Sequence, residues 1–447
     1  MRIKTFRGGV HPPEEKITSQ KPIQELPLPK KVVIPLSQHP GAPAKPMVKV
    51  GDRVMTGQKI GKAQGHISSN IHASISGKIT SIENHPHSLG PPSLAITIES
   101  DGRDEHHPNI KHNNDYFKLH PNEIREIVRE AGIVGLGGAA FPTYVKLSPP
   151  EDKWIDTVIL NGCECEPYLT CDHRLMIEKT YEIIEGLKII AKTLEVTSSY
   201  IGIEKNKEDA IRAVEQEIRN EANMEVVSLK TKYPQGSEKQ LIKAVLNRKV
   251  PSGELPLDVG VIVQNVGTAL AISEAVRKGR PLTERVITVA GGGIRNPANL
   301  RVRIGTIFQE VINFCGGFIG KPGKIIMGGP LMGFSQYTTL VPVIKGTTGI
   351  LVLPEEEVEE IQERSCIRCS RCVDICPMAI TPNLIAKYAS KNKFDWAEEY
   401  GALDCMECGA CAYVCPAKIP LVQLIKYTKS QLTRVTGGTG NTGVTGG

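Results

Sequence analysis

Apolar and polar positions between residues 121 and 280 alternate between a helical and a strand-like period. Ile124, Ile127 and Val128 stand at helical spacing, which predicts a helix over 122–132. Short β-branched runs followed by longer amphipathic stretches then repeat along the chain. They predict strands at 157–162, 200–204, 224–230 and 259–265, and helices at 174–194, 206–220, 238–247 and on to about Arg277. This rhythm is typical of an open parallel sheet covered by helices, an α/β domain.

Residues 28–100 show a different pattern, with short β-like runs punctuated by Gly and Pro. The segments 48–63, 73–82 and 94–100 resemble the barrel-sandwich hybrid fold of biotinyl and lipoyl carriers. In those carriers a lysine at the hairpin tip holds the cofactor, whereas residues 65–76 contain no lysine. We therefore expect the carrier fold without its covalent cofactor, used as a docking module.

The remaining segments complete a multidomain α/β and α+β architecture. Two strands and a helix within 285–317, followed by a strand within 322–333, resemble the soluble-ligand-binding β-grasp (SLBB) domain. The acidic segment 353–365 predicts a helical connector. The predicted order is an extended N-terminal segment (1–27), the barrel-sandwich hybrid (28–100), a polar linker (101–120), the α/β domain (121–280), the β-grasp domain (281–340), a cysteine-rich helical domain (353–434) and a flexible Gly/Thr tail (435–447).

Eight cysteines form two runs of identical spacing, C-x2-C-x2-C-x3-C, each followed by proline and separated by 39 positions. This spacing is typical of bacterial two-cluster ferredoxins, in which the fourth cysteine of each run ligates the other cluster. Zinc sites usually use two separated pairs of ligands, so zinc fits less well. One predicted [4Fe–4S] cluster is held by Cys366, Cys369, Cys372 and Cys415, and the other by Cys405, Cys408, Cys411 and Cys376.

Composition narrows the classes of function. The chain of 447 residues is 40% hydrophobic and 23% charged, with a net charge of +6 and no long basic run, so nothing favours nucleic-acid binding. We find neither a signal-peptide pattern at the start nor an apolar run of about 18 residues. The protein is therefore expected in the cytoplasm, reaching a membrane only through partners. Its surplus of basic residues could serve an acidic partner such as ferredoxin, although such a surplus more often forms a solvated surface.

A second informative stretch is the glycine-rich segment 135–143, GLGGAAFPT. Small residues let backbone N–H groups approach a phosphate or a flavin ring closely. Three further segments, at 161–176, 233–241 and 263–268, follow predicted strands or turns, where α/β sheets bind ligands. Alone, the glycine loop is weak evidence, because it lacks the strand-then-helix context of a dinucleotide fingerprint.

Together these four segments resemble the NADH-binding flavoprotein subunit of respiratory complex I, over about residues 122–335. The resemblance implies NADH and non-covalent FMN as ligands and gives the catalytic roles to Glu166, Lys146 and Phe141. It places Gly138, Phe141, Glu166 and Glu238 around NADH. It implies that FMN is held by Gly135, Gly137, Lys146, Asn161, Glu164, Tyr233, Gly236, Val263, Asn265 and Thr268.

The chain departs from this family at four positions. Leu136 replaces an arginine, Cys163 and Ser237 replace acidic residues, and Gln264 replaces an asparagine. These departures concern the ring contacts and potential of the flavin. The cysteines outside the two runs are interpreted as structural rather than as a third metal site; they are Cys163, Cys165, Cys171 and Cys315.

The order of domains resembles the C subunits of Rnf complexes, which are membrane-bound ferredoxin–NAD oxidoreductases that translocate Na+ or H+. The segments 6–16 and 328–334 match that family as well. The resemblance implies a peripheral subunit at the cytoplasmic face of the membrane, with the other subunits, ferredoxin and NADH as partners. Two alternatives stay open: a cobalamin reductase of the propanediol-utilisation type, which carries its barrel-sandwich module at the C-terminal end, and a non-catalytic Fe–S scaffold.

Overall fold

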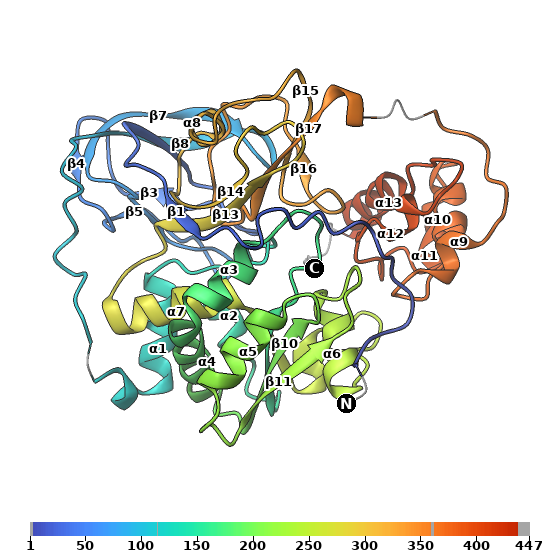
Figure 1. The fold of residues 1–447 in the computed structure, drawn as a ribbon, viewed down its shortest axis with the longest axis horizontal. Coiled ribbons are helices and arrows are strands. Elements are labelled where there is room, and N and C mark those ends of the chain that lie inside the picture. Colours follow the sequence, from blue (N-terminus) through green and yellow to red (C-terminus); the bar gives the residue numbers. More distant parts are fainter. Residues whose placement is uncertain (1–2, 114, 359–361, 437–447) are drawn as a thin grey trace.

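The computed structural model of the protein describes residues 3–113, 115–358 and 362–436. Figure 1 shows the helices of the C-terminal part set to one side of the other domains. We call the parts the barrel domain (28–100), the α/β domain (121–280), the grasp domain (from 281 to the end of its last strand) and the cysteine domain (from 362). Within the described ranges, no helix is both long enough and apolar enough to cross a membrane.

Two small sheets enclose the core of the barrel domain. Ile34, Ile60, Ile79 and Ile96 are fully buried between them. The sheets have the strand orders β2-β8-β7-β4 and β3-β5-β6. The strands are β2 (Lys31–Pro35), β3 (Lys45–Pro46), β4 (Arg53–Val54), β5 (Lys59–Lys62), β6 (Ile71–His72), β7 (Gly77–His87) and β8 (Gly90–Ser100).

The hairpin tip between β5 and β6 is docked against the rest of the chain. The buried ammonium of Lys345, in the grasp domain, donates to the carbonyl oxygens of Asn70 in the tip and of Gly132 in the α/β domain, both at 2.6 Å. A Cβ on Gly132 would lie 2.3 Å from that Asn70 oxygen. The place where carriers hold their cofactor therefore serves here as a contact among three domains.

The α/β domain is a parallel four-stranded sheet in the order β11-β10-β9-β12, with helices on both faces. Successive side chains along β9 point to opposite faces of the sheet, so both faces are apolar. Val158 and Leu160 pack with α4 and α7 on one face, and Ile159 packs with α6 on the other. Its strands are β9 (Thr157–Gly162), β10 (Ser198–Glu204), β11 (Met224–Leu229) and β12 (Val261–Asn265). Its helices are α1 (Pro121–Glu130), α2 (Thr143–Lys146), α3 (Cys171–Glu178), α4 (Thr180–Leu194), α5 (Glu208–Glu217), α6 (Glu238–Leu246) and α7 (Val266–Lys278), with 3-10 turns η1 (Tyr116–Lys118) and η2 (Pro256–Val259).

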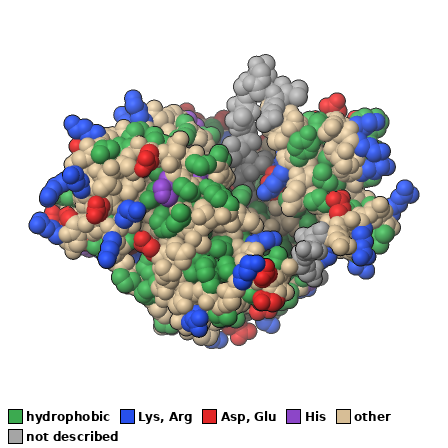
Figure 2. Space-filling model, turned by 90° about the horizontal axis from the view of Figure 1, so that it is seen from above, with side chains coloured by type: hydrophobic (Ala, Val, Ile, Leu, Met, Phe, Trp, Pro, Cys, Tyr) green, Lys and Arg blue, Asp and Glu red, His purple; other side chains and the backbone are tan. Residues whose placement is uncertain are grey.

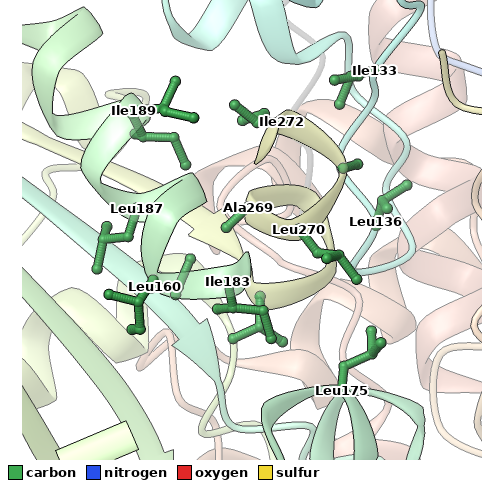
Figure 3. Packing of buried hydrophobic residues seen from close by; sticks show 14 of the residues in the cluster. Ile133, Leu136, Leu160, Leu175, Ile183, Leu187, Ile189, Ala269, Leu270 and Ile272 are labelled. Atoms are coloured by element: carbon green, nitrogen blue, oxygen red, sulfur yellow. The ribbon is translucent and has the colours of Figure 1, made fainter. Parts of the chain in front are cut away.

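Helices α4 and α7 pack tightly at the centre of this domain. Figure 3 shows Ala269 of α7 directed toward α4, while Leu187 of α4 lies near Leu160 of the sheet. The close approach depends on Gly186, because a Cβ there would lie only 1.9 Å from the carbonyl oxygen of Ala269. This packing holds the start of α7, which follows directly on β12.

The single helix predicted at 174–194 is wrong, because the chain forms α3 and α4 with a break at Lys179. Lys179 has φ −135° and ψ 30°, outside the helical region. The hydroxyl of Thr180 donates to the Met176 carbonyl at 2.6 Å, which satisfies a group freed by the break. Hydrophobic periodicity continues across the break, so the sequence pattern gave no signal of it.

The grasp domain contains a six-stranded sheet in the order β1-β14-β13-β17-β15-β16. The N-terminal segment contributes β1 (Ile23–Glu25), which pairs in parallel with β14. The sheet also passes the predicted end of this domain at residue 340, because β17 lies between β13 and β15. The other elements are β13 (Glu284–Ala290), β14 (Ala298–Arg303), α8 (Phe308–Phe314), β15 (Pro322–Met327), β16 (Phe334–Ser335) and β17 (Gly349–Pro354).

The helix predicted at 353–365 is also wrong in the described residues. Residues 353–354 end β17, the 3-10 turn η3 (Glu355–Glu357) follows, and 362–370 has no regular structure. Residues 359–361 of that prediction, and 437–447 of the predicted tail, lie outside the described residues. The cysteine domain contains α9 (Arg371–Asp374), α10 (Pro382–Ala389), α11 (Phe394–Glu399), α12 (Ala410–Tyr413) and α13 (Leu421–Thr436).

Candidate functional site

The predicted flavin and nucleotide residues gather where the strands of the α/β sheet end. The glycine-rich loop 135–141 closes on itself, since the Gly135 N–H donates to the Phe141 carbonyl at 2.8 Å. The Leu136 N–H donates to the buried hydroxyl of Thr268 at 2.9 Å, which ties the loop to α7. Gly138 has φ +114° and open space around its α-carbon. The loop can therefore admit a ligand at Gly138 without meeting protein.

Lys146 and Glu238 form an ion pair across the site. The Lys146 ammonium also donates to the Val263 carbonyl at 3.3 Å. Lys146 ends α2 and Glu238 begins α6, so two helices and β12 meet here. The resemblance assigned Lys146 to the flavin phosphate and Glu238 to the nucleotide, and the structure brings these side chains into contact.

Asn161, at the end of β9, connects the loop after β9 with the turn before α6. Its amide nitrogen donates to the Gly236 carbonyl at 2.7 Å, and its oxygen accepts from the Cys163 N–H at 3.1 Å. The Gly236 N–H in turn points at the Cys165 sulfur, 3.4 Å away. A Cβ on Gly236 would lie 3.2 Å from the Cys163 Cβ. The two loops therefore pack closely at this position, where a side chain would require the neighbouring atoms to shift by a few tenths of an ångström.

Glu164 binds the beginning of α3. Its carboxylate accepts from the N–H groups of Asp172 at 2.7 Å and His173 at 3.0 Å. Asp172, which the sequence analysis did not single out, accepts from the Asn265 amide at 2.6 Å. Burial, followed by the nearby Glu164, raises the pKa of Asp172 to about 7. Glu164, Asp172 and Asn265 therefore form one connected polar set.

Lys16 was missed by the sequence analysis, although it shapes the same loop. Its buried ammonium donates to the carbonyl oxygens of Glu164 at 2.8 Å, Glu166 at 2.8 Å and Leu169 at 2.6 Å. Burial lowers the pKa of Lys16. The sequence offered no local signal, because Lys16 stands in a polar segment about 150 positions from its partners.

Glu166 reaches out of the α/β domain into the grasp domain. Its carboxylate accepts from the N–H groups of Leu331 at 3.0 Å and Met332 at 2.8 Å. Burial raises the pKa of Glu166 to about 7, against the lowering effect of these two donors. A Cβ on Gly329 would lie 2.3 Å from the same carboxylate. The loop 328–333 therefore wraps closely around Glu166.

Two buried side-chain amides have no hydrogen-bond partner within the described part of the chain. In Gln235 both the amide nitrogen and the amide oxygen lack a partner, and in Gln264 the amide nitrogen does. Each stands beside predicted FMN residues, Tyr233 and Gly236 for the first, Val263 and Asn265 for the second. Buried polar groups are normally paired, so these orphaned atoms fit a polar ligand such as FMN.

The eight cysteines of the two runs line two cavities in the crossed grouping that their spacing predicts. We call the set lining the first cavity the outer group: Cys366, Cys369, Cys372 and Cys415. We call the set lining the second cavity the inner group: Cys376, Cys405, Cys408 and Cys411. Four thiol ligands around one small cavity suit a cubane iron–sulfur cluster. Which cysteines ligate which cluster stays a prediction.

The inner group lies against the α/β domain. The hydroxyl of Tyr233, which is buried, donates to the Cys408 carbonyl at 2.6 Å. Val10, Tyr233, Cys408 and Ala410 share one apolar cluster. A predicted flavin residue therefore touches the backbone of a predicted cluster ligand.

The other cysteines make separate contacts. Cys163 donates weakly to the Gly202 carbonyl at 3.8 Å, and Cys171 donates to the Thr348 carbonyl at 3.4 Å. Burial raises the pKa of both thiols well above their usual range. Cys171 also lies near Glu164 and Asp172. The structural role of the four cysteines outside the two runs stays a prediction.

Four family models match the chain in the predicted order. They are the RnfC barrel sandwich hybrid domain (residues 4–103), the Nuo51 FMN-binding domain (128–274), the SLBB domain (286–335) and the 4Fe-4S dicluster domain (359–416). These matches confirm the predicted fold class. They also support the predicted cofactors, FMN and [4Fe–4S] clusters.

Curated relatives match almost the whole chain. The chain is 51% identical to the C subunit of the proton-translocating ferredoxin:NAD(+) oxidoreductase complex of Clostridium ljungdahlii, over 96% of this chain and 94% of the relative. It is 49% identical to the Na(+)-translocating counterpart of Acetobacterium woodii, over 97% and 98%. It is 45% identical to the C subunit of the ion-translocating oxidoreductase complex of Rhodobacter capsulatus, over 96% and 83%. The chain therefore belongs to the family of C subunits of ion-translocating oxidoreductase complexes, the Rnf family that its sequence predicts.

Proposed function

We propose that this subunit binds FMN and NADH in the α/β domain and exchanges electrons between them and two [4Fe–4S] clusters in the cysteine domain. When bound, FMN exchanges a hydride with NADH and the clusters carry single electrons, so one NADH, oxidised to NAD+ with release of a proton, supplies one electron to each cluster. The contact that carries the proposal is the hydrogen bond from Tyr233 to the Cys408 carbonyl. It links the candidate flavin site directly to the inner group.

The chain's own residues would bind and orient the two ligands. Lys146 offers the ammonium that an FMN phosphate would attract away from Glu238. The orphaned amides of Gln235 and Gln264 offer donors that lack a protein partner. Glu166 and Phe141 are assigned to the nicotinamide nucleotide, with Gly138 leaving space for it. Because the inner group touches this site and the outer group reaches the surface, electrons would pass through the inner cluster first.

The outer group also offers a surface for an acidic protein partner. Arg364, Arg368 and Arg371 are exposed around it, and none forms an ion pair within the residues that the structure describes. Figure 2 shows Lys and Arg side chains along the outer edge of the right-hand lobe, where the cysteine domain lies. This charge supports exchange with ferredoxin or with an acidic face of another subunit. We place the protein at the cytoplasmic face of the membrane, held there by the other subunits.

The alternatives drawn from the sequence make different demands. A cobalamin reductase of the propanediol-utilisation type would carry its barrel module at the C-terminal end, whereas residues 4–103 match the RnfC module. A non-catalytic scaffold would hold clusters but no reducible flavin. The test below separates this scaffold from an enzyme.

The experiment loads the purified protein with FMN and with iron and sulfide, removes free flavin, and adds NADH without oxygen. We expect retained FMN to bleach first, followed by the cluster absorbance. The Lys146→Met variant should bind FMN roughly 10- to 150-fold more weakly, because a hydrogen bond to a charged group contributes about 1.5–3 kcal/mol. A wild-type protein that retains no FMN, or retains FMN that NADH does not bleach, would overturn the proposal.

A further inference from the structure

Residues 6–10 of the N-terminal segment run between the α/β domain and the cysteine domain (Figure 1). The Gly9 N–H donates to the Ile375 carbonyl of the cysteine domain at 2.8 Å. The next residue, Val10, exchanges two backbone hydrogen bonds with Tyr233 of the α/β domain, at 2.8 and 2.9 Å. Adjacent residues of one short segment therefore bind the backbones of two domains.

Both glycines of this segment lie too close to their neighbours to carry a side chain. Gly8 has φ +80°, and a Cβ there would lie 2.7 Å from the Ile375 oxygen and 3.0 Å from the Cys376 oxygen. Gly9 has φ +81°, and its Cβ would lie 2.6 Å from the Tyr233 oxygen. The neighbouring atoms belong to the backbone, so a rotamer change cannot relieve either contact. Gly8 therefore lies against the cysteine domain and Gly9 against the α/β domain.

Lys232 fixes the segment from the side of the α/β domain. Its ammonium donates to the carbonyl oxygens of Phe6 at 2.6 Å and Gly8 at 2.8 Å. It also lies 3.9 Å from the centre of the Phe6 ring. Tyr233 of the candidate flavin site directly follows Lys232, so the residue that holds the N-terminal segment is adjacent in sequence to that site.

We propose that residues 6–10 act as a spacer that sets the separation between the flavin site at Tyr233 and the inner group. Gly8 and Gly9 are then positioning residues for electron transfer, acting through the backbones of Ile375, Cys376 and Tyr233. The inference rests on the proposed function. It assigns a role to the N-terminal segment beyond its strand β1.

The test compares Gly8→Ala with Gly102→Ala. Gly102 has φ +73°, similar to Gly8, but a Cβ there meets nothing within 4 Å. Both variants therefore carry a similar backbone strain, and only Gly8→Ala pushes on the cysteine domain. In protein loaded with FMN and clusters, we expect NADH to bleach the flavin at the wild-type rate in both. Cluster reduction should be severalfold slower in Gly8→Ala alone, because displacing the backbone of Ile375 and Cys376 increases the separation across which electrons pass.

Hydrogen exchange of the protein without cofactors gives a readout independent of activity. The amides of Gly9, Val10 and Tyr233 should exchange faster in Gly8→Ala than in Gly102→Ala, because the backbone hydrogen bonds that these amides donate would break more often. If Gly8→Ala loses its clusters, Lys232→Met serves instead, since it removes the hydrogen bonds to Phe6 and Gly8 and keeps both glycines. Lys232→Met should show the same separation between fast flavin bleaching and slow cluster reduction.

Two results would overturn the proposal that residues 6–10 act as a spacer. One is cluster reduction at the wild-type rate in Gly8→Ala, or in Lys232→Met where that variant is the one tested. The other is unchanged amide exchange at all three positions. Failure of the proposed function would give a different result, because NADH would then leave the flavin of the wild-type protein unbleached. The hydrogen-exchange measurement would still show whether residues 6–10 hold the two domains together.

Discussion

The inner and outer cysteine groups share one spacing pattern but have different surroundings. In the inner group, Cys408 and Cys411 are only 6% and 7% exposed, and the Cys408 backbone binds Tyr233 of the α/β domain. In the outer group, Cys366 and Cys369 are exposed, and Ile367 between them is 68% exposed. The repeated motif therefore builds two similar sites, and contacts from outside the motif make one internal and the other superficial.

Under the proposed function, this difference would give the two groups different places in the path of the electrons. The inner group has three neighbours from outside the cysteine domain: Tyr233, the N-terminal segment at Gly8, and the loop 328–333. A Cβ on Gly409, next to Cys408, would lie 2.9 Å from the Leu331 oxygen. Leu331 in turn donates to Glu166. Within the described residues, the inner group is thus connected to Tyr233 and, through Leu331, to Glu166, whereas the exposed cysteines Cys366 and Cys369 belong to the outer group.

The largest expected effect comes from removing one cluster at a time. In Cys408→Ala, NADH should reduce the outer cluster at least about 100-fold more slowly, because the intermediate site is lost. In Cys369→Ala, the inner cluster should still be reduced by NADH at the wild-type rate. Absorbance and electron paramagnetic resonance follow the remaining cluster, and dithionite shows that it is intact. Rapid reduction of the outer cluster in Cys408→Ala would break the assigned order.

The crossover of the fourth ligand is the next test. Cys376 is the fourth cysteine of the first run in the chain but lies with the inner group, so Cys376→Ala should remove the inner cluster and leave about half the iron. The buried Cys315, outside both groups, supplies the control, and Cys315→Ala should keep all the iron. If Cys376→Ala instead loses the cluster of Cys366, Cys369 and Cys372, the two groups are not crossed.

The fold was predictable where its signals are local. The spacing of the eight cysteines depends on a few neighbouring residues, and the α/β rhythm follows from period alone, so both are visible in the sequence. The break at Lys179 was not visible, because periodicity continues from α3 into α4. The acidic segment 353–365 is rich in helix formers, but its first residues are paired in β17 with β15, and tertiary pairing overrides propensity.

The candidate site was predictable only in part, for a related reason. Glycine-rich and polar motifs after strands led to the loops at 135–143, 161–176, 233–241 and 263–268. Lys16 and the amides of Gln235 and Gln264 carry no motif of their own. Their importance arises from burial and from contacts distant in sequence, such as the bond from Lys16 to the Glu166 carbonyl. Such roles appear only once the chain is folded.

Glu166, which the resemblance assigns to NADH, contacts Leu331 beside the inner group, so replacing Glu166 sharpens the comparison. Glu166→Gln should raise the KM for NADH roughly 10- to 150-fold with an artificial acceptor, because it removes a charge and one acceptor oxygen worth about 1.5–3 kcal/mol. Flavin content and dithionite-reduced cluster spectra should not change. Glu363→Gln, at an exposed carboxylate preceding the outer group, is the control and should leave the KM unchanged. Loss of FMN with normal NADH affinity would make Glu166 a flavin ligand.

The smallest expected effect is the part of the pH dependence of stability that Glu166 contributes. Burial raises the pKa of Glu166 from 4.5 to about 7 in the folded protein. Between these values the folded state holds a proton that the unfolded state has released, so the free energy of unfolding falls as pH rises from about 5 to 7. One pKa unit corresponds to about 1.4 kcal/mol, and partial solvent access reduces the effect to about 1–2 kcal/mol. Denaturant unfolding at pH 5 and pH 8 should therefore show a larger loss of stability in the wild type than in Glu166→Gln. In Glu363→Gln the loss should equal that of the wild type, and an equal loss in all three proteins would show that the Glu166 carboxyl is ionised throughout this range.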